Sequence, residues 1–201
     1  MSRDQLIADL RNAIDSVGAE PSRQGEARKR KRTVTAPSKN APNGPESASN
    51  DASQALKKIV DLVNVSDRSE LSVRERLSQC GFEEAAIEEA VSRAKDYGFI
   101  DDMRFAEVLI RSRIAQCKGS AGIERELAKN GIDPSSIEGW PYEYEVDDEV
   151  ELDRALSFLD RKPPKSKNLR EGAFRKLVQR GFPISVASTA ARMWTERTTG
   201  T

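Results

Sequence analysis

Residues 77–82 of this 201-residue sequence read Leu-Ser-Gln-Cys-Gly-Phe. The pattern of a leucine, three residues, a glycine and an apolar residue returns as Leu-Ala-Lys-Asn-Gly-Ile at 127–132 and Leu-Val-Gln-Arg-Gly-Phe at 177–182. Each copy is typical of a helix end, where a leucine is buried in the last turn, the glycine adopts the left-handed conformation and the apolar residue folds back. The spacing of about fifty residues is typical of stacked helical repeats.

The apolar residues around these helix ends are also spaced as in helices. A stripe over residues 86–94 reappears two periods later over 186–194, and further stripes cover 56–63 and 105–114. No stretch alternates convincingly at period two, so strands are not expected. The predicted fold is all-α, an elongated stack of three tandem three-helix repeats, the third truncated, after a disordered N-terminal tail.

The composition along the chain predicts where these parts begin and end. Residues 1–54 form a mostly disordered tail with a short helix over 3–17 and a basic tract at 28–32, because the segment from 19 to 53 carries Val34 as its one large apolar residue. A leading helix covers 55–66, followed by repeats over 67–117, 118–166 and 167–197. Pro141 falls inside the middle helix of the second repeat, and this helix should end after Trp140.

The composition also excludes several functional classes. The sequence has no histidine and two cysteines, which removes histidine-based catalysis, the common zinc sites and a disulfide scaffold. We expect no metal and no cofactor. Lys and Arg total 33, as do Asp and Glu, so net charge does not drive non-specific binding to nucleic acid. With no apolar run long enough to span a membrane and reduced thiols, we expect a cytoplasmic protein.

Asp101 and Asp102 are the nearest approach to a catalytic pair. They precede a strongly amphipathic segment, where a carboxylate at the start of a helix satisfies free backbone N–H groups. Adjacent helical residues point about 100° apart and do not converge on one ligand. We therefore favour a capping role over metal binding or acid–base chemistry. Gly98 is expected to end the preceding helix, with Phe99 and Ile100 in the core.

A set of cations is the remaining candidate for a binding surface. An acidic block over 143–153 gives way to a basic block over 161–180, and the net charge hides this division. Two interpretations stay open for these cations, a solvated surface or a contact to acidic protein or phosphate. The candidate contact residues are Arg104, Arg111, Arg113, Lys118, Arg125, Arg161, Lys162, Lys165, Lys167, Arg170, Arg175, Lys176 and Arg180.

One stretch resembles a known family. The run Tyr97-Gly-Phe-Ile-Asp-Asp-x-Arg-Phe-Ala106 and the later Lys118-Gly-x-x-x-Ile-x-x-Glu-Leu-x-x-x-Gly-Ile132 are similar to the bacterial RecX family, and the resemblance extends over about residues 65–194. Some residues of this motif, and of the helix end that repeats along the chain, are expected to have a structural role. They are Gly81, Phe82, Gly98, Asp101, Asp102, Phe105, Ala106, Gly119, Leu127, Gly131, Leu177 and Gly181.

The resemblance implies a non-enzymatic regulator of the RecA recombinase. Proteins of this family are stacked three-helix repeats that lodge in the groove of the RecA–DNA filament and limit filament growth, strand exchange, ATPase and coprotease activity. Some also bind DNA weakly. The expected partners are therefore RecA and its filament on DNA, with a monomeric protein, no membrane and the candidate cations at the contact. A stand-alone DNA- or RNA-binding protein that uses the basic tract and the basic block is the alternative, and a metal-dependent hydrolase at Asp101 and Asp102 is a third.

Overall fold

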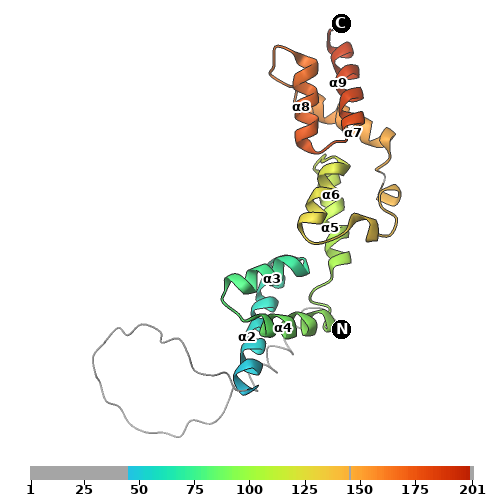
Figure 1. Cartoon of the computed structure of the whole chain (residues 1–201). Coiled ribbons are helices and arrows are strands. Elements are labelled where there is room, and N and C mark those ends of the chain that lie inside the picture. Colours follow the sequence, from blue (N-terminus) through green and yellow to red (C-terminus); the bar gives the residue numbers. More distant parts are fainter. Residues whose placement is uncertain (1–44, 145, 200–201) are drawn as a thin grey trace, which may run out of the picture. The chain divides into compact units, whose positions relative to one another are not determined.

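The computed structural model describes residues 45–144 and 146–199, with side chains from residue 51 onward. The predicted helix over 3–17 and the basic tract at 28–32 lie outside the described residues. Every regular element within the described ranges is helical, so the all-α prediction is confirmed (Figure 1). The elements are α2 (Pro45–Val65), α3 (Glu70–Gln79), α4 (Glu84–Asp96), α5 (Asp102–Ala115), α6 (Ser120–Lys129), the short 3-10 turns η1 (Pro134–Ser136) and η2 (Tyr142–Tyr144), α7 (Asp148–Arg161), α8 (Leu169–Arg180) and α9 (Ile184–Thr199).

The three repeated helix ends have the predicted geometry. The backbone φ angle is +88° at Gly81, +78° at Gly131 and +92° at Gly181. In each copy the amide of the apolar residue after the glycine donates to the carbonyl of the repeated leucine, with N···O distances of 3.3, 3.0 and 3.1 Å in chain order. The three leucines are fully buried. The repeat is therefore a repeated Schellman-type helix end. Gly98 ends α4 in the same way, with φ +69°.

α2 begins earlier than the sequence indicated. The predicted leading helix covers 55–66, whereas α2 starts at Pro45 and takes in ten residues that were assigned to the disordered tail. A proline suits the first helical turn because its missing N–H would have no partner there. Further along, Ala52 and Ala55 are fully buried and extend the apolar stripe of Leu56 and Ile59 toward the N-terminus. These alanines were overlooked because the prediction depended on large apolar residues.

The buried side chains form three clusters, and these group the helices differently from the predicted repeats. One cluster joins α2, α3 and α4, a second joins α5, α6 and residues 132–144, and a third joins α7, α8 and α9. Each packing unit thus begins one helix earlier than the predicted boundaries at 67, 118 and 167. α7 supplies the helix that the third repeat was expected to lack. A period determines the length of a repeat but not its starting point, which packing decides.

The middle helix of the second repeat, predicted to end after Trp140, is absent from the described residues, and two short 3-10 turns and irregular structure take its place. η1 and η2 cover this stretch, and Trp140 and Tyr144 pack with their rings 5.8 Å apart at the edge of the second cluster. Phe105 and Leu109 of α5 lie against the same cluster. The second packing unit therefore buries its apolar face without a third full helix.

The chain divides into two compact units. The first contains α2, the part of α3 from Val73 onward and α4, and the second contains Asp67–Ser72 and everything from Asp101 on. All thirteen candidate cations belong to the second unit.

Within the second unit, α6 and α8 meet backbone to backbone. Gly122 N donates to Gly181 O at 2.8 Å and Gly119 N to Arg180 O at 3.3 Å. A Cβ atom placed on Gly181 would lie 2.5 Å from the Gly122 Cα, and one placed on Gly119 would lie 2.3 Å from the Phe182 Cα. No side chain fits between the start of α6 and the end of α8, so glycine is required on both sides.

A similar arrangement recurs one repeat earlier. Ser69 Oγ lies 3.3 Å from Asn130 Oδ1, and a Cβ atom on Gly131 would lie 3.2 Å from the Leu71 Cβ. The end of α8 thus covers the first turn of α6, and the end of α6 covers the first turn of α3. α3, α6 and α8 are the helices that carry the repeated leucine and glycine. The internal symmetry of the sequence is thus matched by a repeated contact.

Gly81 and Gly181 have the same left-handed backbone conformation but different surroundings. Alanine at Gly81 meets nothing within 4 Å, so Gly81→Ala should cost about 1–2 kcal/mol of unfolding free energy for the left-handed backbone alone. Gly181→Ala adds the clash with Gly122 and should cost about 3 kcal/mol or more. Urea unfolding followed by far-ultraviolet circular dichroism measures both. Equal losses in the two variants would contradict the close contact of α6 and α8.

Candidate functional site

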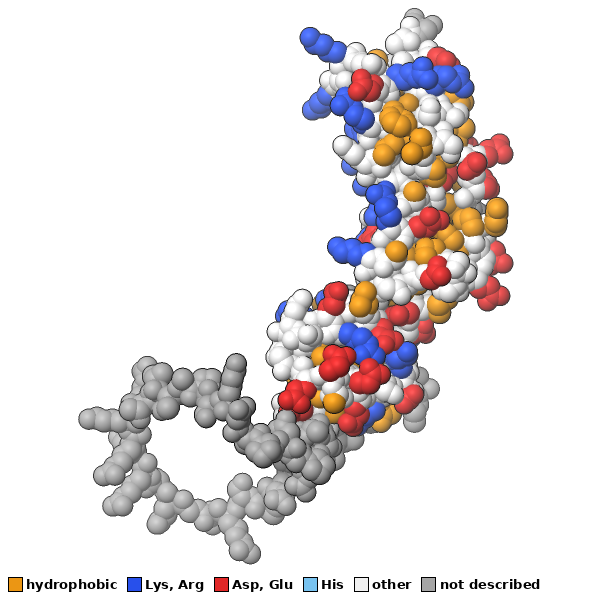
Figure 2. All heavy atoms as spheres, in the orientation of Figure 1, with side chains coloured by type: hydrophobic (Ala, Val, Ile, Leu, Met, Phe, Trp, Pro, Cys, Tyr) orange, Lys and Arg blue, Asp and Glu red, His pale blue; other side chains and the backbone are white. Residues whose placement is uncertain are grey.

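The charged side chains of the second unit are segregated. Figure 2 shows many Lys and Arg side chains of the second unit on the side of α6 and the loop before α8, with others over α9, while Asp and Glu side chains gather on the opposite side, near η2 and the start of α7. The acidic and basic blocks of the sequence therefore remain apart in the fold. Individual contacts show which of the thirteen candidate cations are available to a partner.

Arg113 and Lys118 are bound inside the unit. Both contact the half-buried Glu126 carboxylate: Arg113 Nε donates at 3.0 and 2.9 Å, and Lys118 Nζ lies 2.5 Å from Oε2. Hydrogen bonds from Arg113 and then Lys118 lower the pKa of Glu126 to about 2, although burial opposes the shift. The same hydrogen bond raises the pKa of Arg113. This triad fastens α5 to α6 and leaves little free charge for a partner.

Three further candidates also have internal roles. Arg180 donates through Nε to Cys117 O at 3.2 Å, and Lys176 donates through Nζ to Lys162 O at 2.6 Å. Both cations lie over the ring of Phe158, 5.4 and 5.8 Å from its centroid. Arg104 lies 3.8 Å from Asp101, the carboxylate that caps its own helix.

The remaining candidates are exposed. Arg111 and Arg175 have glutamate neighbours one turn away at 3.6 and 3.8 Å, which are weak surface pairs. Arg125 donates to Ala121 O at 2.9 Å. We define the basic edge as the exposed cations of the loop before α8 and of α8 itself, namely Lys162, Lys165, Lys167, Arg170 and Arg175.

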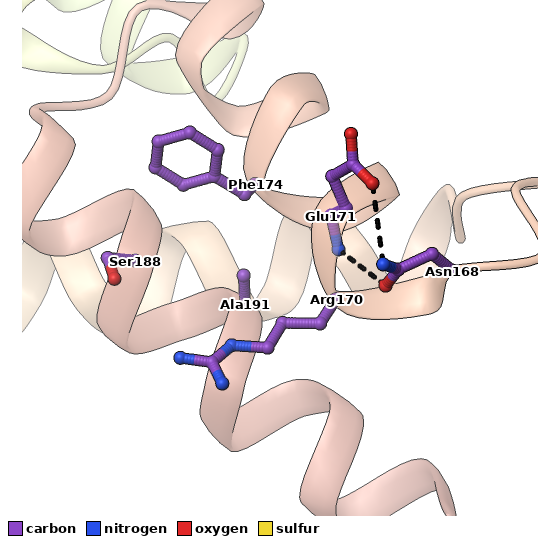
Figure 3. Close-up of a pocket in the computed structure, with 6 residues that line it drawn as sticks. All are labelled: Asn168, Arg170, Glu171, Phe174, Ser188 and Ala191. Carbon is purple, nitrogen blue, oxygen red and sulfur yellow. Dashed lines mark hydrogen bonds between the residues drawn. The ribbon is translucent and has the colours of Figure 1, made fainter.

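A shallow hollow of about 220 Å³ adjoins the basic edge, between α8 and α9. Figure 3 shows Phe174 and Ala191 at its apolar wall, with Arg170 extending from α8 toward α9. Asn168 caps α8 by accepting from Glu171 N at 3.1 Å, and it also donates to the Glu171 side chain. An apolar wall with an arginine beside it is a common composition for a protein contact.

Asp101 and Asp102 cap two different helices. Asp101 Oδ1 accepts from Arg104 N at 2.9 Å at the start of α5, whereas Asp102 Oδ1 accepts from Glu70 N at 2.8 Å at the start of α3. Asp101 thus has the predicted capping role at the start of α5, whereas Asp102 caps α3, a helix that the sequence analysis did not connect with it. In the part of the chain that the structure describes, no three carboxylate or thiol groups come together as a metal site would need.

The other motif residues have structural surroundings. Ala106 is fully buried in the second cluster and Phe105 packs against its edge. Gly119 supplies the close approach to α8 described above.

Glu151 is a structural residue that the sequence analysis missed. It was grouped with the acidic block, but it is 1% exposed and its carboxylate accepts from Ser120 N at 2.6 Å and Ser120 Oγ at 2.9 Å. Burial raises the pKa of Glu151, while the bonds from Ser120 oppose the rise. It caps α6 from α7, much as Asp102 caps α3 from α5. A signal was available, since Glu151 shares the i, i+4, i+8 stripe of Ala155 and Leu159.

Comparison with known proteins now places the chain. A family model described as RecX, second three-helix domain, matches residues 101–139, the stretch of α5, α6 and η1. Regulatory protein RecX of Listeria monocytogenes serotype 4a is 30% identical over 144 residues, which cover 69% of this chain and 53% of that protein. Regulatory protein RecX of Bacillus velezensis is 27% identical over 146 residues, covering 70% and 55%.

The chain is similar to RecX proteins along most of its described length. It spans about half the length of the curated RecX relatives it matches. The crystal structure of RecX from Lactobacillus salivarius has a TM-score of 0.59 at 20% identity, over 73% of this chain and 98% of that one, and shows the same fold. The RecX match from 101 to 139 follows the packing unit and not the predicted repeat boundary at 118. No described helix is long and apolar enough to cross a membrane.

The Glu126 triad makes the stability of the protein depend on pH. Because the pKa of Glu126 is about 2 in the fold and 4.5 ordinarily, its contribution is present above about pH 4.5 and is lost as the pH falls toward 2. Glu126→Gln should lower the unfolding free energy by about 1–3 kcal/mol at pH 7 and flatten its decline below pH 4.5. Urea unfolding across pH 2–7 measures this, with the exposed Glu149→Gln as control. If the unfolding free energy of Glu126→Gln still declined below pH 4.5 as steeply as that of the parent protein, the triad would not be the cause of that decline.

Proposed function

We propose that this RecX-like chain is a non-enzymatic regulator that binds the RecA recombinase or its filament on DNA. In this proposal it limits filament growth, strand exchange, ATPase and coprotease activity, and acts in the cytoplasm as a monomer. The observation that carries the proposal is the RecX match itself, since its relatives are named regulatory proteins. The capping roles of Asp101 and Asp102 support regulation by binding.

The basic edge is the part of the candidate set best suited to the contact. Its lysines and arginines are exposed, whereas Arg113, Lys118, Lys176 and Arg180 are engaged within the unit. Exposed charge of one sign steers association and selects partners of the opposite sign. The apolar hollow beside Arg170 would add the desolvated centre that such a contact needs.

Regulation in this proposal requires no chemical step. A folded unit that touches two neighbouring RecA protomers binds best to one relative orientation of the pair. It therefore shifts the filament toward that orientation by differential binding. The effect on ATP hydrolysis follows from the change in filament state.

A stand-alone DNA- or RNA-binding protein remains the second candidate. Lys162, Lys165 and Lys167 favour it, because no carboxylate pairs with them among the described residues. Such a protein would bind naked DNA with a steep salt dependence and would not require RecA.

The deciding measurement is the single-strand-DNA-dependent ATPase of the cognate RecA, titrated with substoichiometric amounts of this protein. We expect this protein to suppress the ATPase at well below one molecule of it per RecA protomer. Lys167→Glu combined with Arg170→Glu should raise the concentration needed for half-inhibition about tenfold, because two contacts in the basic edge become repulsive.

The matched control is Arg76→Glu combined with Arg93→Glu, which reverses two charges of the first unit, the exposed Arg76 and the partly exposed Arg93. It should inhibit like the parent protein. No inhibition at equimolar protein, with binding to naked DNA intact, would support the second candidate. If both double variants inhibited the ATPase equally weakly, the net charge of the protein and not the basic edge would determine inhibition.

A further inference from the structure

A small cavity of about 150 Å³ lies where the ends of α5, α7 and α8 converge. Its lining comes from all three helix ends: Ala115, Gln116, Cys117, Phe158, Arg161, Lys162 and Arg180. It is separate from the hollow between α8 and α9. No residue of the RecX match between 101 and 139 except the stretch 115–117 takes part in it.

The cations around this cavity have neutral partners. Arg180 donates to the carbonyls of Gln116 and Cys117, and Arg161 donates to Ser157 O at 3.2 Å and to the Cys117 thiol. Lys176, beside Phe158, donates to backbone carbonyls, and Lys162 has no partner side chain within the described ranges. This differs from Arg111, Arg175 and Arg192, each of which has a glutamate one turn away.

The adjacent carboxylate does not neutralise the cluster. Asp160, next to Arg161 in the sequence, accepts from Trp194 Nε1 at 2.9 Å and from Arg197. Both partners belong to α9, so Asp160 is used in fastening α7 to α9. No carboxylate lines the cavity.

The C-terminal ends of the three helices supply some negative charge, and the size of this charge decides whether the cavity stays net positive. Each helix C-terminus carries about half a negative charge, so the three helix ends together fall short of the three cations that line the cavity, and Lys176 adds a fourth beside it. The site therefore keeps a net positive charge after the backbone carbonyls are counted. The Cys117 thiol is a weak acceptor, so the Arg161 guanidinium can exchange it for a better one at little cost.

We propose that this cavity binds a phosphate group. A guanidinium pairs with two phosphate oxygens in parallel, and a lysine adds a point charge. Arg161 and Lys162 are exposed at the mouth, while the half-buried Arg180 provides a fixed positive wall. The phosphate comes from a nucleic-acid backbone or from a small free phosphate compound. The site does not depend on the proposed action on RecA.

The test uses the full chain with ¹⁵N-labelled arginine, observed through the Nε–H resonances of Arg161 and Arg180. Inorganic phosphate and pyrophosphate form one arm, and a single-stranded oligonucleotide followed by fluorescence anisotropy forms the other. Sodium chloride at matched ionic strength controls for screening. We expect saturable shifts of both resonances with phosphate but not with chloride.

The test variant is Arg161→Gln combined with Lys162→Gln, and the control is Arg125→Gln combined with Lys129→Gln. The test variant should weaken phosphate binding about tenfold, and the control should leave it unchanged. If oligonucleotide binding weakens in parallel, the source is a nucleic-acid backbone. If it does not, the site holds a small phosphate compound. The proposal is overturned if phosphate and pyrophosphate give no saturable shift of the Arg161 and Arg180 resonances, or if the test and control variants lose phosphate binding equally.

Discussion

The second unit depends on the close approach of two helix ends, Gly119 and Gly122 at the start of α6 and Gly181 at the end of α8. Backbone meets backbone there, so the free N–H groups of one helix find carbonyls of another. That contact places Cys117, which leads into α6, beside Arg180 at the end of α8. The cationic cavity adjoins this contact, since Cys117 and Arg180 both line it, and Lys118 of the Glu126 triad follows Cys117 directly in the chain.

Some charged side chains of this protein stabilise helix ends and others are exposed to solvent, and the two kinds lie close together in the sequence. Carboxylates such as Asp102 and Glu151 lie at helix starts, and cations such as Arg180 lie over carbonyls at helix ends, as the helix dipole favours. The remaining cations, including Lys167 and Arg170, are exposed and face solvent. The structural cations hold the exposed ones on a defined surface, so the proposed contact with a partner needs both.

Much of this fold was predictable because its strongest signals are local. The leucine, glycine and apolar residue at 77–82 and its two copies act within one helix end, and all three have the expected geometry. The starting point of the packing unit was not predictable, because the same period fits any starting helix. Nor could the sequence distinguish Arg113 from Arg111: both lie in α5, but only the packing of α6 brings Glu126 to one of them.

The three buried clusters are nearly contiguous in the chain, over residues 55–100, then 105–144, then 152–194 with Cys117. Contacts between residues close in sequence form quickly because little chain entropy is lost in closing the loops. On a translating ribosome each cluster would have all its apolar residues available before most of the next cluster emerged. The α6–α8 contact, which joins residues 119–122 to 180–182, would close only after the second cluster has emerged in full, so synthesis order and assembly order would coincide there.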